Sequence, residues 1–301
     1  FKYFDATWGE IPLVALESNN ETHDKIVFDQ LEKYKWPKFV KTFSNFPIKG
    51  IKTDNQKLKR SLCLSYIEKI SNFKFSYQEK DINKTSPLLI YLHGFMGNKK
   101  DQFFDQINYD ILSFDLPGHG QTGCHLFKDY NDIIRQLLQV FILLSSEEII
   151  FYGYSMGGRI LSSCVQTLTE INPKHKFFFE STHLGLQSSS EKEKRLTHDK
   201  NISCQIEKIP TLDEYKKFLN SWYDQAVFKD IKKIHHYQKF LLKKCDSLSL
   251  AEIQDFSKGL TMMSLGHQEN QQSLIQHKNC YFLIGDLDNK FKNYYLELFK
   301  D

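Results

Sequence analysis

Residues 153–157 (GYSMG) place a serine between small residues, a pattern that supplies nucleophiles and bases in enzymes. The apolar run at 149–152 precedes this motif and predicts a buried strand, and a helical pattern begins at Gly158. Glycines around a serine allow the strained strand-to-helix turn that exposes its hydroxyl at the edge of a sheet. The sequence therefore predicts a nucleophile elbow with Ser155 at its tip.

Two further glycine-rich loops each follow an apolar run. Residues 93–97 (HGFMG) occupy the place where enzymes with such an elbow take one backbone N–H of an oxyanion hole. The second N–H comes from the residue after the nucleophile. We therefore expect the N–H groups of Phe95 and Met156 to stabilise developing negative charge. In the other loop, residues 115–120 (DLPGHG), we expect His119 to stabilise the turn instead of performing chemistry.

The elements that hold these loops alternate between strands and helices. Residues 129–144 have apolar positions at helical spacing. Apolar runs predict buried strands at residues 88–92, 108–114, 148–152, 177–179 and 281–284. This alternation indicates a mostly parallel, doubly wound sheet with helices on its faces. Residues 188–277 break the alternation, because they are polar and helical in pattern, and we expect a lid over the carboxyl ends of the strands.

The chain divides at the turn-forming residues before Pro87. We expect an α/β domain over 86–301, with its core at 86–187 and 278–301 and its lid at 188–277. Residues 1–85 are polar and rich in lysine and asparagine. They are expected to be an N-terminal extension or the remnant of a fused upstream domain.

Composition and charge exclude several classes of protein. The 301 residues are 41% hydrophobic and 26% charged, which excludes global disorder. A net charge of +3 gives no argument for binding nucleic acid or an anionic membrane. No apolar run reaches the roughly 18 residues that a membrane span needs. The six cysteines are scattered without a CxxC pair, which predicts reduced thiols in an intracellular compartment and neither a disulfide framework nor a zinc site. We expect no metal site.

Four stretches form one pattern, in order along the chain: residues 92–97 (LHGFMG), 153–159 (GYSMGGR), 222–228 (WYDQAVF) and 285–291 (GDLDNKF). The pattern resembles the 2-succinyl-6-hydroxy-2,4-cyclohexadiene-1-carboxylate synthase family, lyases of menaquinone and phylloquinone biosynthesis. The resemblance covers about residues 86–301 and implies the α/β-hydrolase fold, here truncated at its C-terminus. It also implies a reaction without cofactors, in which proton abstraction is followed by elimination of pyruvate.

The resemblance assigns roles to individual residues. Ser155 matches the triad serine and Asp288 the triad acid. Phe95 and Met156 match the oxyanion hole. The positions matching the substrate pocket are His93, Tyr154, Arg159, Arg195, Trp222 and Lys290. The partner implied is a small molecule with several carboxylates, which arginine binds strongly through paired hydrogen bonds.

A Ser-His-Asp triad of this fold takes its histidine from the chain after the acid. No histidine follows Asp288 in these 301 residues. Between serine and acid, His183 alone follows a predicted strand closely enough to be a substitute. We therefore expect either a fragment of a longer enzyme or a degenerate, inactive relative. A first residue other than methionine and the intact elbow favour the fragment.

Residues 6–13 (ATWGEIPL) resemble the start of o-succinylbenzoate synthase, the next enzyme of the pathway. The two enzymes are joined in one plastid protein in plants and some algae. The resemblance implies fusion to other pathway enzymes, and a plastid location if the source is an alga or plant, with the cytoplasm otherwise. The alternative for this segment is an unrelated extension.

Two other functions remain open from the sequence. A serine hydrolase acting on an ester or thioester would use the same elbow, because fold does not determine chemistry. A catalytically dead, hydrolase-like binding module would explain the missing histidine. The lid motif at 222–228 and the motif at 285–291 favour the lyase.

Overall fold

The computed structural model describes residues 2–5, 9–14, 39–40, 60–80, 86–102, 104, 107–145, 148–225, 228, 232, 237–245, 248–286 and 288–300. The chain forms two compact units, residues 1–70 and 71–301. The first holds helix α3 (Arg60–Ile70) and a sheet in the order β1 (Lys2–Asp5), β2 (Gly9–Val14), β3 (Phe39–Val40). Part of the segment that resembles o-succinylbenzoate synthase, residues 6–8, lies outside the described residues.

The second unit is built on a six-stranded sheet in the order β4-β6-β5-β7-β8-β9. Its strands are β4 (Phe75–Gln78), β5 (Leu88–Leu92), β6 (Asp110–Phe114), β7 (Ile149–Tyr154), β8 (Lys176–Glu180) and β9 (Cys280–Leu283). Every neighbouring pair is parallel except β4 with β6. All five residues of β5 and of β6 are buried, as continuous apolar runs require. The predicted parallel α/β sheet is confirmed.

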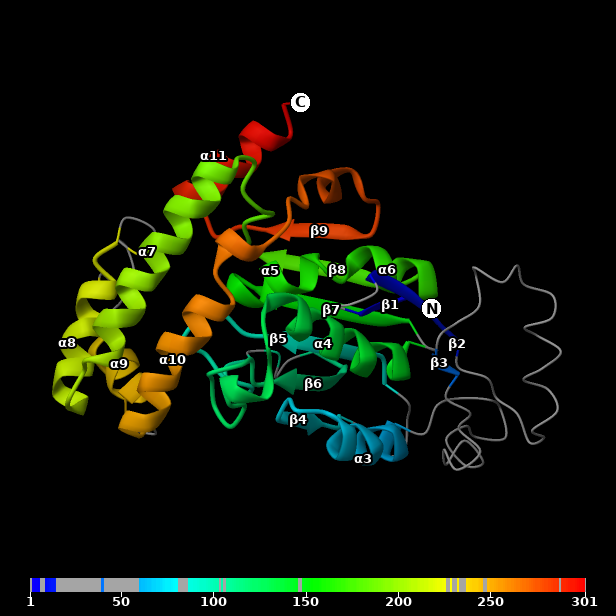
Figure 1. Ribbon diagram of the computed structural model, residues 1–301, viewed down its shortest axis with the longest axis horizontal. Coiled ribbons are helices and arrows are strands. Elements are labelled where there is room, and N and C mark those ends of the chain that lie inside the picture. Colours follow the sequence, from blue (N-terminus) through cyan, green and yellow to red (C-terminus); the bar gives the residue numbers. More distant parts are fainter. Residues whose placement is uncertain are drawn as a thin grey trace, which may run out of the picture. The chain divides into compact units, whose positions relative to one another are not determined.

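Three helices lie over one face of this sheet: α4 (Tyr130–Leu144), α5 (Met156–Ser162) and α6 (Val165–Ile171) (Figure 1). Helix α4 begins at Asp129, whose carboxylate accepts a hydrogen bond of 2.8 Å from the N–H of Asp132. Its buried residues recur at helical spacing, and Phe141 packs on Phe151 of β7 with ring centroids 5.2 Å apart. This packing fixes the strand that leads into the elbow.

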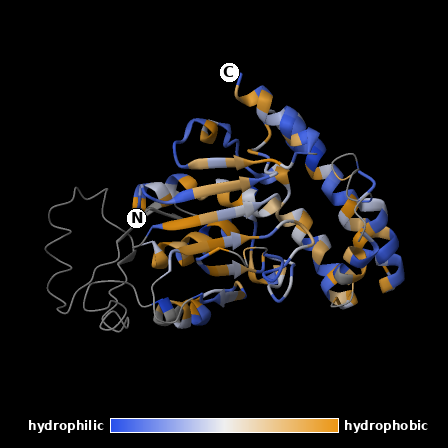
Figure 2. Ribbon diagram, turned by 180° about the vertical axis from the view of Figure 1, so that it is seen from behind, coloured by the Kyte–Doolittle hydropathy of each residue, from blue (hydrophilic) through white to orange (hydrophobic). Residues whose placement is uncertain are grey.

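In the described part of the segment between β8 and β9, four α-helices form the predicted lid: α7 (Ser189–Glu207), α8 (Leu212–Trp222), α9 (Tyr237–Cys245) and α10 (Leu250–Met262). Capping boxes at Ser188 and Ser249 start α7 and α10. The lid helices stand beyond the carboxyl ends of the strands (Figure 1). Figure 2 shows the strands mainly in hydrophobic colours and α7 mainly in hydrophilic ones. The lid helices share an apolar core that also contains Met96 of the loop at residues 93–97; its lid members include Tyr215, Leu219, Leu241, Ile253 and Phe256.

The expected boundary at residue 85 is wrong for the sheet. Strand β4 precedes that boundary and pairs antiparallel with β6, with Phe75 opposite Phe114. Phe73, next to β4, is buried and packs on Phe114. As an edge strand, β4 buries its residues only partly, so its sequence lacks the apolar run that marks the central strands.

After β9 the chain forms α11 (Asn289–Leu298). Its buried residues Phe291 and Tyr295 form a small apolar cluster with Leu184. Among the described residues, no helix combines the length and the apolar character that crossing a bilayer requires.

Candidate active site

Ser155 stands between β7 and α5 with a φ of +49° and a ψ of −107°. This backbone conformation is strained for a residue with a side chain. The turn is tight because a β-carbon at Gly157 would lie 2.3 Å from the carbonyl oxygen of Leu92, and one at Gly153 would lie 2.4 Å from the Cα of Gly158. The strained elbow predicted at Ser155 is confirmed.

The loop at residues 93–97 lies against the elbow. A β-carbon at Gly94 would be 3.5 Å from the Cβ of Ser155 and 2.7 Å from the ring of Tyr154. Met156 is the first residue of α5, so its N–H has no acceptor inside the helix. The segments that carry Phe95 and Met156 therefore meet at the serine, while the oxyanion role of their N–H groups stays a prediction.

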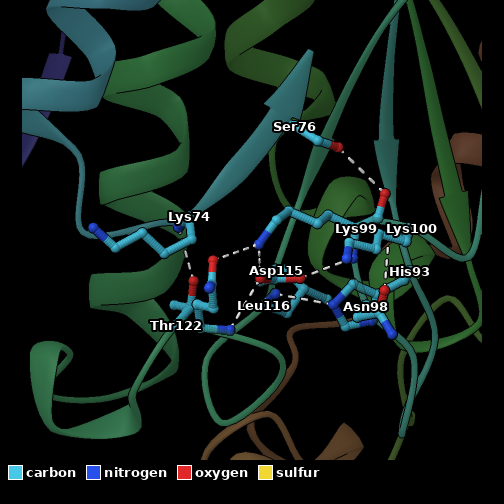
Figure 3. A network of polar contacts seen from close by, with 10 residues as sticks. Lys74, Ser76, His93, Asn98, Lys99, Lys100, Asp115, Leu116 and Thr122 are labelled. Atoms are coloured by element: carbon cyan, nitrogen blue, oxygen red, sulfur yellow. Dashed lines mark hydrogen bonds and ion pairs between the residues drawn. The ribbon is translucent and has the colours of Figure 1, made fainter. Parts of the chain in front are cut away.

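Two buried histidines connect the loop after β5 to the loop after β6. Nε2 of His93 accepts a hydrogen bond of 3.0 Å from the N–H of Leu116, so Nδ1 carries the proton and donates it to the carbonyl of Gly94 at 2.7 Å (Figure 3). Nε2 of His119 likewise accepts from the N–H of Met96 at 3.1 Å, and its Nδ1 donates to a carbonyl at 2.9 Å. Burial lowers the pKa of both imidazoles, which keeps them neutral.

These contacts bear on the roles expected for His119 and His93. His119 stabilises its turn, as the sequence predicts. The substrate-binding role expected for His93 is wrong, because its ring is fully buried and both ring nitrogens are bonded to backbone groups. The chain position of His93, beside a glycine loop, does not reveal that the imidazole points under the loop.

A buried carboxylate, Asp115, also holds the loop after β5 in place. Asp115 accepts hydrogen bonds from the backbone N–H of Lys99 at 2.8 Å and of Gln121 at 3.0 Å, and it also pairs with the Lys99 ammonium group (Figure 3). The backbone carbonyl of Lys99, in turn, accepts a hydrogen bond of 3.4 Å from the hydroxyl of Ser76 on β4. The loop beside Ser155 is thereby fixed to two neighbouring strands.

Asp288 follows β9 and caps α11. Its Oδ1 accepts from the N–H of Phe291 at 3.1 Å, and its Oδ2 accepts from the hydroxyl of Ser181 at 2.9 Å. Ser181 comes directly after Glu180, whose carbonyl accepts from the N–H of Ser155 at 2.8 Å. The elbow and the predicted triad acid are thus connected through two consecutive residues at the end of β8.

Three cationic side chains come together from three elements: Arg159 of α5, Arg195 of α7 and Lys290 of α11. Arg159 is 8% exposed, and burial together with the charge of Arg195 lowers its pKa to about 10. Partial burial of its ammonium group and the charge of Arg195 also lower the pKa of Lys290, although that residue as a whole is exposed. Within the described part of the chain, no carboxylate lies at ion-pair distance from Arg159 or Lys290. The cluster is suited to an anion.

His183 belongs to this cluster. Its Nδ1 accepts from the N–H of Gly185 at 3.2 Å, and its ring stacks on Tyr294 at 4.3 Å. Burial and the charges of Arg159, Lys290 and Arg195 lower its pKa to about 4. An imidazole with that pKa is a weak base at neutral pH, which argues against His183 as a substitute for a triad histidine.

The two aromatic residues expected in the pocket both contact the loop at residues 93–97. The ring of Tyr154 packs under the loop at 93–97, and burial, with the charges of Glu180 and Asp288, raises its pKa to about 12. Trp222, at the end of α8, packs on Phe95 with ring centroids 5.5 Å apart. The lid therefore contacts the loop beside Ser155.

The sequence analysis missed polar residues that support these groups. Glu180 and Ser181 connect serine to acid, but neither stands in a recognisable motif. Ser264 bonds to Asp199 across 65 positions, and no local pattern signals that contact. Asp199 itself could be found, because it stands four residues after Arg195 on one helix.

Fold and elbow together define an α/β hydrolase. Residues 87–175 match the family described as alpha/beta hydrolase fold. The structure is similar in fold to MenH from S. aureus, with a TM-score of 0.55 and 20% identity, over 75% of this chain and 97% of that one.

Sequence relatives narrow this class. The chain is 32% identical over 213 residues to 2-succinyl-6-hydroxy-2,4-cyclohexadiene-1-carboxylate synthase of Yersinia pestis bv. Antiqua (strain Nepal516), covering 68% of this chain and 74% of the relative. Identity and coverage are the same for the synthase of Yersinia pseudotuberculosis serotype O:1b (strain IP 31758). The chain therefore belongs to the 2-succinyl-6-hydroxy-2,4-cyclohexadiene-1-carboxylate synthase family.

Proposed function

We propose that this chain carries the site of a carbon–oxygen lyase of menaquinone biosynthesis. The reaction eliminates pyruvate from 2-succinyl-5-enolpyruvyl-6-hydroxy-3-cyclohexene-1-carboxylate and gives 2-succinyl-6-hydroxy-2,4-cyclohexadiene-1-carboxylate. The names of the relatives that match over two thirds of the chain support this proposal.

The observation that carries the proposal is the cluster of Arg159, Arg195 and Lys290. Burial and the charge of Arg195 lower the pKa of Arg159, and burial with the charges of Arg195 and Arg159 lowers the pKa of Lys290, an arrangement that a bound anion would relieve. The proposed substrate bears three carboxylates, on the succinyl arm, on the ring and on the enolpyruvyl group. A neutral ester would give these cations no partner.

In the proposed reaction the hydroxyl oxygen of Ser155 takes a proton from a ring carbon. The electron pair left on ring carbon 2 forms a double bond to carbon 3, the existing ring double bond shifts to carbons 4 and 5, and the bond from carbon 5 to the enolpyruvyl oxygen breaks. The leaving group departs as the enolate of pyruvate and takes up a proton. Asp288 would orient the imidazole that accepts the serine proton, and that imidazole is assigned to no residue described here.

The backbone N–H groups of Phe95 and Met156 would stabilise the negative charge that develops on the ketone oxygen of the succinyl arm, which is attached to the ring carbon that loses its proton. Trp222 and Tyr154 would cover the ring and exclude water. The buried histidines and Asp115 would hold the loop at 93–97 rigid, so that its N–H groups need no rearrangement during the reaction.

The test is calorimetric titration with 2-succinylbenzoate, which carries the succinyl and ring carboxylates of the product on an aromatic ring. We expect binding to the wild-type chain, with affinity that falls as salt is added. Arg159→Lys keeps the charge but loses the paired donors, and should weaken binding about tenfold. Binding that is unchanged by Arg159→Lys and by Lys290→Ala would remove the support for this substrate class.

A further inference from the structure

Arg195 is held at one side of its guanidinium by a buried carboxylate. Its Nε donates to both oxygens of Asp199, at 2.9 and 2.8 Å. Asp199 is 1% exposed, and its Oδ2 also accepts from the hydroxyl of Ser264 at 2.7 Å. Ser264, itself fully buried, stands between α10 and the short helix Leu265–His267, so the contact joins two elements of the lid.

This pairing leaves the other end of the guanidinium open. No described residue accepts a hydrogen bond from Nη1 or Nη2 of Arg195. Those two nitrogens form the edge of the planar fork that binds a carboxylate through paired hydrogen bonds. The charge of Arg195 acts on Arg159 and on Lys290, so its guanidinium belongs to the cation cluster.

Without a restraint, Arg195 would not stay there. Its side chain is 33% exposed, and the two other cations repel it toward solvent, where it regains conformational freedom. A buried carboxylate at Nε opposes both effects before any substrate has bound.

We propose that Asp199, backed by Ser264, is a positioning residue that aims the two terminal nitrogens of Arg195 at a carboxylate of the substrate. This inference rests on the proposed function, because it takes the cation cluster to be the substrate-carboxylate site.

The sign of one substitution separates positioning from simple charge. Asp199 is an anion near an anion site, so by Coulomb's law alone its removal should tighten the binding of a polycarboxylate. If Asp199 positions Arg195, Asp199→Asn should instead weaken that binding, because an amide holds the guanidinium less firmly. A merely structural role would lower the melting temperature and leave the affinity of the folded protein unchanged.

The experiment measures the affinity of the full chain for 2-succinylbenzoate by calorimetry, in a double-mutant cycle. We expect Arg195→Ala to weaken binding about tenfold and Asp199→Asn about fivefold. In the Arg195→Ala background, Asp199→Asn should change affinity less than twofold, because its effect passes through Arg195. Glu214→Gln is the matched control: it removes a lid carboxylate that pairs with Lys217, and affinity should not change.

Each outcome separates the two proposals. If Arg195→Ala weakens binding while Asp199→Asn leaves it equal or tighter, the positioning role is wrong and the substrate site stands. If neither Arg195→Ala nor Arg159→Lys changes binding, the proposed function itself fails. Ser264→Ala keeps the carboxylate and should weaken binding about twofold to threefold. It provides the test if Asp199→Asn does not fold, and unchanged affinity in Ser264→Ala would then overturn the inference.

Discussion

The carbonyl of Glu180 accepts a hydrogen bond of 2.8 Å from the N–H of Ser155, so the last residue of β8 holds the tip of the elbow. The next residue, Ser181, donates its hydroxyl to Asp288. Two consecutive residues at the end of β8 thereby place the predicted nucleophile and the predicted acid at the same edge of the sheet. This arrangement depends on the parallel pairing of β7 with β8 and of β8 with β9.

The strain at Ser155 predicts an unusual order of stabilities. Ser155→Ala and Ser155→Gly both remove the hydroxyl, but only glycine adopts a positive φ without strain. We expect Ser155→Gly to unfold with a free energy about 1 kcal/mol higher than Ser155→Ala, measured by urea denaturation. Equal stabilities, or a more stable alanine variant, would show that the serine backbone is relaxed.

The tight turn predicts a difference between two glycines. In Gly157→Ala, the new β-carbon meets the backbone oxygen of Leu92 at 2.3 Å, which cannot move without disturbing β5. We expect a loss of about 1–3 kcal/mol in the free energy of unfolding. Gly285→Ala is the control, because its β-carbon would meet only the Cβ of Asp288 at 4.0 Å. Similar effects for both variants would contradict the crowding at the elbow.

Buried neutral histidines predict that the protein loses stability as the medium becomes acidic. Burial lowers the pKa of His93 and His119 in the folded state, and burial with neighbouring cations lowers that of His183 from 6.5 to about 4. As the pH falls below 6.5, the unfolded chain therefore binds protons that the folded chain does not. The contribution of these histidines to the free energy of unfolding is fully present above this pH. It decreases as the pH falls toward their pKa values in the folded state, by at most about 1.4 kcal/mol per pH unit for each histidine.

The measurement is urea denaturation at a series of pH values. His119→Gln should make the free energy of unfolding depend less steeply on pH, because it removes the contribution of one histidine. The glutamine amide does not titrate but can still accept a hydrogen bond. His125→Gln is the control, because His125 is exposed. A slope unchanged by His119→Gln would mean that this imidazole is not kept neutral by the fold.

The central part of the fold could be predicted from the sequence because its signal is local. Strands β5 and β7 are apolar runs followed by glycine motifs, so both the strands and the loops after them could be predicted from the sequence. Strand β4 is a half-buried edge strand with no such run, and it becomes part of the sheet only through its pairing with β6.

Residues of the candidate site could be selected from the sequence where a motif fixes both residue type and chain position. Arg159 and Lys290 stand in such motifs, and the structure brings them together with Arg195. The contrary case is His93, whose ring direction is set by a hydrogen bond from the N–H of Leu116 in the loop after β6. The contact of Asp199 with Ser264 was equally hidden, because it depends on how the lid helices pack.

Pyruvate release from 2-succinyl-5-enolpyruvyl-6-hydroxy-3-cyclohexene-1-carboxylate tests the central claim most directly. It should be measured with the wild-type chain and with Ser155→Ala, each with and without added imidazole, beside the hydrolysis of a neutral p-nitrophenyl ester. We predict slow pyruvate release that imidazole accelerates and Ser155→Ala abolishes, with little ester hydrolysis. Ester hydrolysis that requires Ser155, without pyruvate release under either condition, would contradict the lyase and identify a hydrolase.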